Sequence, residues 1–334
     1  MDIRGSRDPA MTDVARLAGV SHQTVSRVLN GHPNVKEQTR LRVRAAIAEL
    51  GYRPNRAART LVTGRSQQLG VVTMNSTLFG PASLLTAFEQ AAAEAGFAVS
   101  VASVASLDRA SVTAAVERHL DQRVAGVVVI APTVSAGEGL ADMPAGVPLV
   151  TVDGDPEQTH ALVTVDQVAG ARAATRHLLD AGHETVWHVS GPAQWYDAAG
   201  RIEGWRQALI EAGAEQPPLV AADWSAAAGY SAGQMLARMP EVTAVFAAND
   251  HLALGLLRAL HEKGRRVPGD VSVVGFDDVP EAAYFIPPLT TVRPDFAAVA
   301  HAGLELLLAQ IGTPGTPAGR RVIAPELVVR DSVR

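Results

Sequence analysis

The sequence predicts an α/β protein: a helix-turn-helix head followed by a large body of two lobes, each built on a parallel sheet. Three observations predict this fold. Two short helical patterns flank a tight turn near the N-terminus. Apolar strands then alternate with amphipathic helices along the remaining chain. The formal charge changes sign between the two parts, and 334 residues are enough for a head and a two-lobed body.

The helix-turn-helix prediction rests on residues 14–31, VARLAGVSHQTVSRVLNG. Gly19 suits a helix C-terminus, and Ser21 is a good N-cap for a second helix. A third helix is expected over 36–50, with Gly51 just after its end. The residues expected to pack inward recur at helical spacing: Val14, Ala15, Leu17, Ala18, Val25, Val28 and Leu29.

Charge favours DNA docking over the alternative of a plain helical bundle. Residues 1–66 hold twelve basic and five acidic side chains, a formal charge of +7. The whole chain carries −5, so residues 67–334 carry −12. A basic head on an acidic body is typical of a nucleic-acid-binding domain joined to a domain with another role.

The segment 54–66 joins the head to the body. Pro54 and Asn55 can open a helix of about two turns that ends at Gly64. A helix this short is marginal in water by itself. The segment is therefore either a flexible linker or a helix that orders on DNA.

The body shows two series of apolar strands. Strands are expected at LGVVTM, FAVSVAS, GVVVIAP, PLVTVDG, ALVTVD, TVWHVSG, PPLVAAD, TAVFAAND and VSVVGFDD. Helices are expected over 81–95, 111–122, 166–181, 200–212, 225–239 and 251–263, and WYDAAG (195–200) is expected to be a loop. Apolar strands separated by helices favour parallel sheets with right-handed crossovers.

Ligands of open α/β sheets bind beyond the carboxyl ends of the strands. We therefore expect a ligand cleft near the polar residues that follow the strands. These are Asn75, Asp153, Ser190, Asp223, Asn249, Asp250, Asp277 and Asp278.

Several classes of protein are disfavoured. The chain has no Cys for disulfides or thiolate metal sites. It has no run of 18 apolar residues that could span a membrane and no apolar signal within its first ten residues. A cytoplasmic protein without cofactor or metal is therefore expected. It lacks GxxxxGK and HExxH motifs and has no Cys nucleophile, so an enzyme is not expected. His183 and His188 are poorly spaced for a metal, and adjacent Asp277 and Asp278 should point apart.

Four motifs resemble the lactose/galactose-repressor family of bacterial transcription factors: TDVARLAGVSHQTVSRVLNG, YRPNRAARTLVTGRS, FAANDHLALGLLRAL and VPGDVSVVGFDD. The resemblance runs from Met11 to the end. DWSAAAGY (223–230) and YFIPPLTTVRPDF (284–296) resemble the lactose repressor and its β-galactoside-responsive relatives.

The resemblance implies a domain organisation. It places a DNA-binding domain at 11–53, a hinge helix at 54–66 and a periplasmic-binding-protein-like effector and dimerisation domain at 67–334. The N-lobe would hold about 67–165 and 294–324, and the C-lobe about 166–293 and 325–334.

The resemblance also implies that a homodimer docks on near-palindromic double-stranded operator DNA, with the second helix in the major groove. His22 and Gln23 would touch base edges, and Arg27 a guanine or a phosphate. Leu61 would wedge into the minor groove and kink the duplex, or would pack only on its partner helix. The remaining implied DNA contacts are Ser21, Thr24, Ser26, Asn30, Asn55, Arg56 and Ala58.

For the effector, the resemblance implies a sugar. The implied polar contacts are Asp153, Arg201, Asn249 and Asp277, the implied stacking residue is Trp224, and the implied apolar walls are Leu78, Pro81, Val165, Phe296 and Val299. Each has an ordinary alternative: a turn former for Asp153, a helix cap for Asn249, a helix-face charge for Arg201 and a core residue for Trp224.

Two features depart from the lactose repressor. Pro294 stands where that protein has a polar side chain, and Trp195 and Tyr196 add aromatic bulk beside the cleft. We expect a repressor that a β-galactoside or a related glucoside or xyloside releases from DNA. The alternatives are another glycoside such as cellobiose, a purine-type corepressor, and a DNA-tethered glycoside-acting enzyme. The strand-like ending PELVVRDSVR lacks a heptad helix, which predicts a dimer rather than a tetramer.

Overall fold

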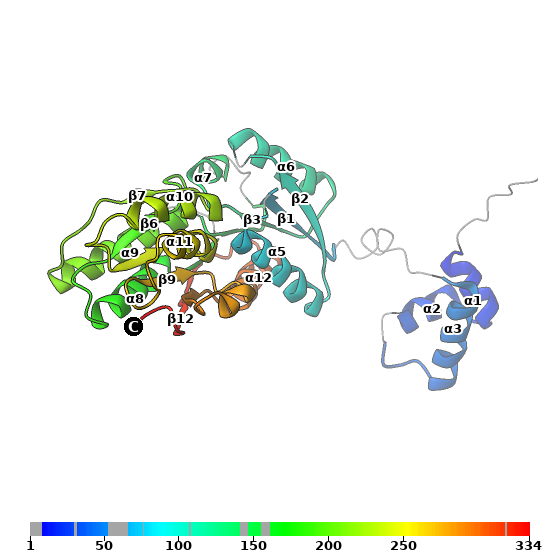
Figure 1. Cartoon of the computed structure of the whole chain (residues 1–334). Coiled ribbons are helices and arrows are strands. Elements are labelled where there is room, and N and C mark those ends of the chain that lie inside the picture. Colours follow the sequence, from blue (N-terminus) through cyan, green and yellow to red (C-terminus); the bar gives the residue numbers. More distant parts are fainter. Residues whose placement is uncertain are drawn as a thin grey trace, which may run out of the picture. The chain divides into compact units, whose positions relative to one another are not determined.

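The computed structural model describes residues 9–29, 32–52, 66–75, 77–106, 108–140, 146–154, 161–317 and 319–334. The chain divides into two compact units, residues 1–66 and 67–334 (Figure 1). The fold class predicted from the sequence is confirmed: the first unit is helical, and the second holds two six-stranded sheets.

The first unit contains the expected helix-turn-helix. Its helices are α1 (Met11–Ala18), α2 (His22–Leu29) and α3 (Glu37–Leu50). Gly19 and Gly51 end α1 and α3 with φ of 63° and 61°, a left-handed conformation that glycine adopts without strain. The hydroxyl of Ser21 accepts a 3.2 Å hydrogen bond from the backbone N–H of Thr24, so Ser21 is the N-cap of α2.

One expected core residue of this unit is on the surface. Leu17 is 46% exposed, whereas Val14, Ala15 and Ala18 are buried. A helix of eight residues packs only a narrow stripe on its neighbours, and Leu17 lies beside that stripe. The fully buried Val14, Val25 and Val43 bring one side chain from each helix to the centre of the unit.

The N-lobe is built on a parallel sheet in the order β11-β5-β4-β3-β1-β2. Its strands are β1 (Gln68–Met74), β2 (Ala98–Val104), β3 (Val127–Ile130), β4 (Leu149–Val152), β5 (Ala161–Val165) and β11 (Arg320–Ile323). Its helices are α5 (Phe79–Glu94), α6 (Arg109–Asp121), α7 (Val134–Leu140) and α12 (Phe296–Gly312). The strands β3 and β4 are buried throughout because helices cover both faces of the sheet.

The C-lobe sheet has the order β12-β10-β9-β8-β6-β7, with only β12 antiparallel among its strands. Its strands are β6 (Trp187–Ser190), β7 (Val220–Ala221), β8 (Ala244–Ala247), β9 (Ser272–Phe276), β10 (Thr290–Arg293) and β12 (Glu326–Val328). Its helices are α8 (Gln167–Asp180), α9 (Tyr196–Ala212), α10 (Ala226–Leu236), α11 (Asp250–Glu262) and the 3₁₀ helix η1 (Pro280–Tyr284).

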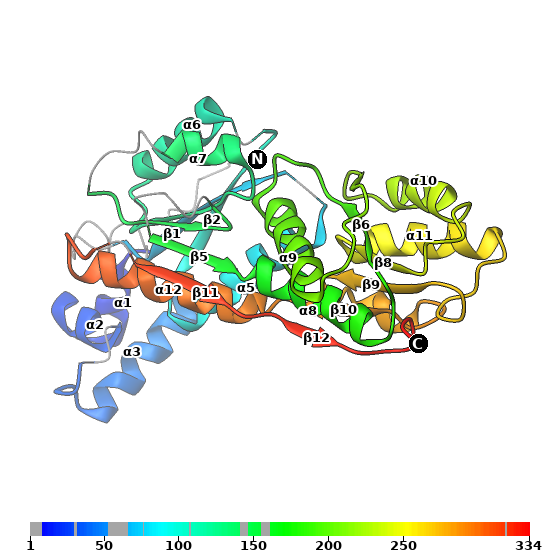
Figure 2. The same ribbon diagram turned by 90° about the vertical axis from the view of Figure 1, so that its left-hand side faces the viewer.

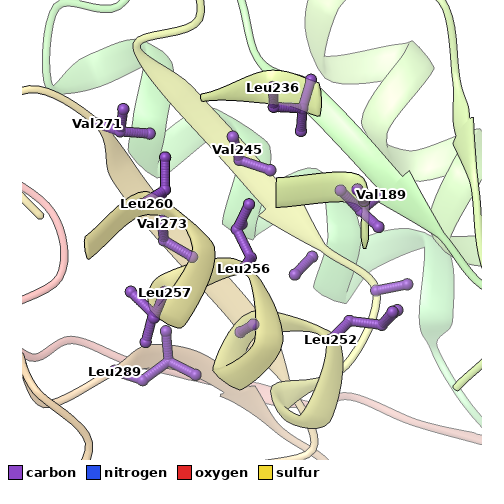
Figure 3. Close-up of a cluster of buried hydrophobic side chains, with 14 of the residues drawn as sticks. Val189, Leu236, Val245, Leu252, Leu256, Leu257, Leu260, Val271, Val273 and Leu289 are labelled. Carbon is purple, nitrogen blue, oxygen red and sulfur yellow. The ribbon is translucent and has the colours of Figure 1, made fainter. Parts of the chain in front are cut away.

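The C-lobe core lies between α11 and the sheet (Figure 3). Leu252, Leu256 and Leu260 recur every four residues on α11 and are fully buried. The helix α10 packs unusually close to α11. A Cβ at Gly255 would lie 1.9 Å from the carbonyl oxygen of Ala226, so this contact requires glycine.

The chain passes between the lobes three times: from β5 to α8, from β10 to α12, and from β11 to β12. Figure 2 shows β11 and β12 as one extended segment that runs along both lobes. The segment WYDAAG, expected to be a loop, is instead the start of α9, which begins at Tyr196. None of the described helices is long and apolar enough to cross a membrane.

Candidate functional site

A cavity opens between the two lobes, at the carboxyl ends of their strands. Its empty space is about 520 Å³ when the part open to solvent is counted, but only about 30 Å³ can hold the centre of a water-sized sphere. Both lobes line it, with Leu78, Phe79, Gly80, Pro81, Ile130, Pro132, Asp153, Pro294 and Phe296 on one side and Gln167, Trp195, Asp197, Arg201, Trp224, Asn249 and Asp277 on the other.

Strained turns hold two of the carboxylates at the cavity. Asp153 follows β4 and Asp277 follows β9, with φ of 54° and 105°. Their backbone N–H groups still bond to the neighbouring strands, at Val163 and Val292. Non-glycine residues seldom adopt positive φ, and such strain clusters at functional sites. The turns therefore fix the two side chains at the sheet edges.

The guanidinium of Arg201 is the centre of the polar network. Its Nε donates to Oε1 of Gln167 at 2.9 Å, and another nitrogen donates to the carbonyl oxygen of Ala248. Its remaining nitrogen lies 3.4 Å from Oδ1 of Asp277 and 3.9 Å from Oδ2 of Asp197. The plane of the ring of Phe276 supports the guanidinium from 3.7 Å.

The three cavity carboxylates are poorly solvated and mutually repulsive. Burial, and secondarily the Asp197 carboxylate, raise the pKa of Asp153 to about 8. Burial also raises the pKa of Asp197, and raises that of Asp277 to about 6 although Arg201 opposes the shift. The cavity therefore holds a proton on at least one carboxyl near neutral pH.

Aromatic side chains form two walls. Trp195 and Trp224 meet edge to face in the C-lobe, with ring centroids 5.5 Å apart. Phe79 and Phe296 meet in the same way in the N-lobe, 6.1 Å apart. A Cβ at Gly191 would lie 2.3 Å from the indole of Trp224, so glycine at this turn makes room for the ring.

A backbone bridge joins the lobes beside the cavity. The N–H of Tyr196 donates to the carbonyl oxygen of Pro132 at 2.9 Å, and the N–H of Val134 donates to the carbonyl oxygen of Gln194 at 3.1 Å. Trp195 belongs to this bridge and also lines the cavity. A ligand that touches Trp195 would therefore act directly on an inter-lobe contact.

The structure brings most of the expected effector residues together. The cavity is lined by Leu78, Pro81, Asp153, Arg201, Trp224, Asn249, Asp277 and Phe296. Val165 and Val299 are not at the cavity. They are buried in the N-lobe core, because the inward faces of β5 and α12 pack on each other there. Trp195 lines the cavity, but Tyr196 does not.

The strand-end rule selected too many residues. Asn75, Ser190, Asp223, Asp250 and Asp278 are absent from the cavity lining. Asp250 is fully buried and accepts hydrogen bonds from Thr291 and Val279, which ties together the loops after β8 and β9. Asp278 turns away from Asp277 and pairs with Arg293 and Arg330 at 2.6 Å each. Both carboxylates therefore hold the C-lobe together.

Sequence reasoning missed Asp197 and Gln167. Asp197 lies four residues before Arg201, the spacing that places both on one face of a helix. The loop expected over WYDAAG obscures this helical spacing. Gln167 starts α8 directly after the crossover from β5, and only the tertiary structure shows that it meets Arg201.

Asn249 and Trp224 also keep their ordinary structural roles. Oδ1 of Asn249 caps α11 by accepting from the N–H of Leu252 at 2.8 Å, and its Nδ2 donates to the carbonyl oxygen of Trp224 at 3.2 Å. Trp224 is 9% exposed and packs in the C-lobe core. Its indole Nε1 is buried and, within the described part of the chain, has no hydrogen-bond partner.

Comparison with known proteins places the chain in a family. Residues 10–55 match the model of bacterial regulatory proteins, lacI family, and residues 175–333 match a periplasmic binding protein-like domain. The chain is 35% identical over 321 residues to the lactose operon repressor of Escherichia coli (strain K12), covering 95% of this chain and 89% of that protein. The chain belongs to the lacI family.

Other relatives agree. The transcriptional regulator CelR of Thermobifida fusca is 36% identical over 345 residues, covering 98% of both chains. A lac repressor dimer bound to operator and the anti-inducer ONPF superposes with a TM-score of 0.86 at 32% identity, covering 98% of this chain and 99% of that one. A CelR-cellobiose complex superposes with a TM-score of 0.72 at 34% identity, covering 97% and 99%.

This LacI-family protein is therefore a ligand-responsive, DNA-binding transcriptional regulator rather than an enzyme. In α2, His22, Gln23 and Arg27 are exposed, and Thr24 and Ser26 are half-buried. The hydroxyls of Ser21 and Thr24 lie 2.9 Å apart at the start of α2. The other expected DNA contacts, Asn30, Asn55, Arg56, Ala58 and Leu61, lie outside the described residues.

Proposed function

We propose that this regulator is a repressor that binds a near-palindromic operator as a homodimer, and that a glycoside entering the inter-lobe cavity releases it. The observation that carries the proposal is the composition of the cavity. Carboxylates and an amide from the strand ends lie between two aromatic pairs that come from opposite lobes. A sugar needs both kinds of group, since its hydroxyls require acceptors and its ring faces pack on aromatic rings.

A disaccharide matches the aromatic surface of the cavity better than a single hexose. Trp195 and Trp224 each offer apolar surface, and Phe79 and Phe296 face them from the other lobe. The buried Nε1–H of Trp224 supplies a donor for a sugar oxygen. We favour a β-galactoside, with cellobiose as the second candidate because Trp195 enlarges the aromatic surface and a cellobiose complex of a relative shares the fold.

Release from DNA requires that the glycoside bind one lobe arrangement more tightly than the other. The backbone bridge between Pro132 and Tyr196 is a contact that such a rearrangement would change. The resemblance assigns the hinge segment 54–66 the role of transmitting that change, with Leu61 as the minor-groove wedge. A wedge unstacks a base step at a cost of roughly a few kcal/mol that the wider contact offsets.

The homodimer is supported by exposed apolar side chains on the C-lobe. Tyr284 and Ile286 are 85% and 93% exposed, and Leu254 is 41% exposed. Surface apolar residues of this size favour burial against a partner. The superposed lac repressor binds its operator as a dimer.

A binding panel on the full-length chain tests the proposal. Thermal shifts are measured with lactose, cellobiose, xylobiose, galactose and hypoxanthine, since a ligand at about 100 times its Kd stabilises by roughly 2.7 kcal/mol. DNA selected by the protein from a random library then serves as the operator. We expect a near-palindromic selected sequence and weaker DNA binding with the stabilising disaccharide. A shift with hypoxanthine alone, or tighter DNA binding with the sugar, would contradict induction by a glycoside.

A further inference from the structure

The cavity carries an excess of negative charge. Among the described residues that line it, the ionisable side chains are Asp153, Asp197, Asp277 and Arg201. Three carboxyls therefore face a single guanidinium. Even with one carboxyl protonated, the site is not positively charged, and an anionic group brought into it would meet like charges.

Arg201 has little capacity left for an anion. Its nitrogens already contact Gln167, Ala248, Asp277 and Asp197, and Phe276 covers one face of the guanidinium. An arginine that binds a phosphate or carboxylate of a ligand usually presents two parallel N–H groups to it. Here three of the five N–H groups already donate to the protein, to Gln167, Ala248 and Asp277.

The N-termini of helices carry a partial positive charge that would attract an anion. Acidic side chains already offset this charge at most of the helix starts near the cavity. Each helix start carries up to about half a positive charge, and α5, α8, α9, α11 and α12 all begin at or near the cavity. Four of these starts have an acidic side chain at the cap or in the first turn: Asp166, Asp197, Asp250 and Asp295. The helix α5 begins without one, as do α10 and α7, which start beside the lining residues Trp224 and Pro132.

The carboxylates retain unused acceptor capacity. Among the described residues, Asp153 accepts from the hydroxyl of Thr164, at 3.2 Å from Oδ1, and from the backbone N–H of Val165, while Asp197 contacts Arg201 at 3.9 Å. An ionised carboxylate offers about four lone pairs, and a protonated carboxyl keeps part of this acceptor capacity and adds one O–H donor. The donors that match this arrangement are hydroxyl groups of a ligand.

We propose that the cavity selects an uncharged, hydroxyl-rich glycoside and excludes glycosides that carry a phosphate or a carboxylate, with Asp197 as the main excluding residue. The inference rests on the proposed function and narrows its ligand class. Asp197 has this role because its contact with Arg201 is the longest of the guanidinium contacts and its side chain is the more exposed of the two carboxylates paired with Arg201, 18% against 10% for Asp277.

Calorimetry on the full-length chain tests the inference with matched ligands. The pairs are cellobiose against cellobiose 6′-phosphate and lactose against lactose 6′-phosphate. We expect the neutral member of one pair to bind, and its phosphorylated partner to bind at least about 100-fold more weakly, because juxtaposed like charges strongly suppress wrong partners. Raised salt should reduce this ratio by screening.

Two variants test whether Asp197 excludes the phosphorylated ligands. Asp197→Asn should reduce the ratio of the Kd of the phosphorylated ligand to the Kd of the neutral ligand by at least about tenfold. Circular dichroism checks that this variant keeps the fold. Asp180→Asn, which removes an exposed carboxylate that pairs with Arg176 on α8, should leave the ratio unchanged.

The outcomes separate the two proposals. Phosphorylated ligand that binds the parent chain as tightly as the neutral one overturns the inference but leaves the proposed function standing. An unchanged ratio in Asp197→Asn overturns the role of Asp197. Binding of no member of either pair rules out both favoured disaccharides and overturns this inference, while the wider panel still decides the glycoside response.

Discussion

The backbone N–H of Tyr196 donates a 2.9 Å hydrogen bond to the carbonyl oxygen of Pro132 and thereby joins the C-lobe to the N-lobe. The bond lies beside the cavity, since Pro132 and the neighbouring Trp195 both line it. Tyr196 is also the first residue of α9. The start of a helix is thus coupled to the contact between the lobes.

Tyr196→Pro should remove this bond without breaking α9. Proline is tolerated at the first position of a helix, and the preceding Trp195 has the extended conformation (φ −95°, ψ 129°) that proline requires of its neighbour. We expect faster hydrogen exchange at the N–H of Val134, which donates to Gln194 in the same bridge. Mass spectrometry of the full-length chain measures it.

Tyr196→Ala is the matched control, because it keeps the N–H and removes only the side chain. It should leave exchange at Val134 near the parent rate. Equal acceleration in the alanine and proline variants would show that the side chain, rather than the backbone bond, holds the bridge.

Trp224→Ala should weaken binding of the stabilising glycoside by roughly 10- to 100-fold, since a buried aromatic wall contributes strongly to ligand affinity. Calorimetry measures the loss. Trp187→Ala serves as control, because Trp187 begins β6 and does not line the cavity although it packs on the same core. A similar loss of affinity in both variants would mean that core destabilisation, rather than ligand contact, accounts for the effect.

The raised pKa of Asp153, about 8 in the fold, makes stability depend on pH. An unfolded aspartate has a pKa of about 3.9. The unfolded chain therefore loses this proton first as the pH rises, and the free energy of unfolding decreases between about pH 4 and pH 8. Besides burial, the Asp197 carboxylate opposes ionisation of Asp153, whereas the Thr164 hydroxyl, the backbone N–H of Val165 and Arg201 favour it.

Asp153→Asn should remove this dependence. We expect the Tm of the variant to exceed that of the parent above pH 8, and the difference to narrow as the pH approaches 4. Differential scanning calorimetry between pH 4 and pH 9 measures it, with Asp180→Asn as the surface control. A difference in Tm that stays constant across this range would contradict a raised pKa at Asp153.

Arg27→Ala should weaken binding to the selected operator by roughly 10- to 100-fold and relax its sequence preference, as expected for a side chain that reads a base. Arg27 is exposed on α2. Arg42→Ala removes one positive charge from an exposed position of α3 in the same unit. Fluorescence anisotropy with selected and random DNA measures both, and matching losses in the two variants would assign Arg27 a general electrostatic role.

The sequence alone predicted the type and order of nearly all the elements. Glycines marked the ends of α1 and α3, and strand-like apolar runs marked both sheets, because backbone conformation and burial are local properties of composition and spacing. The local sequence pattern did not predict the first turn of α9. Its first turn, WYDAAG, lacks an ordinary N-cap side chain, and a backbone bridge from the other lobe satisfies it instead.

The sequence also determined where a ligand site could be, at the polar residues that follow parallel strands. Only the tertiary structure decided which of them face the cavity. Asn249 and Asp250 are adjacent, as are Asp277 and Asp278, yet one member of each pair lines the cavity and the other ties the C-lobe together. A strand pattern locates the edge of a sheet, but the direction of a side chain beyond that edge depends on the turn conformation and on partners distant in the sequence, such as Arg201, Thr291 and Arg330.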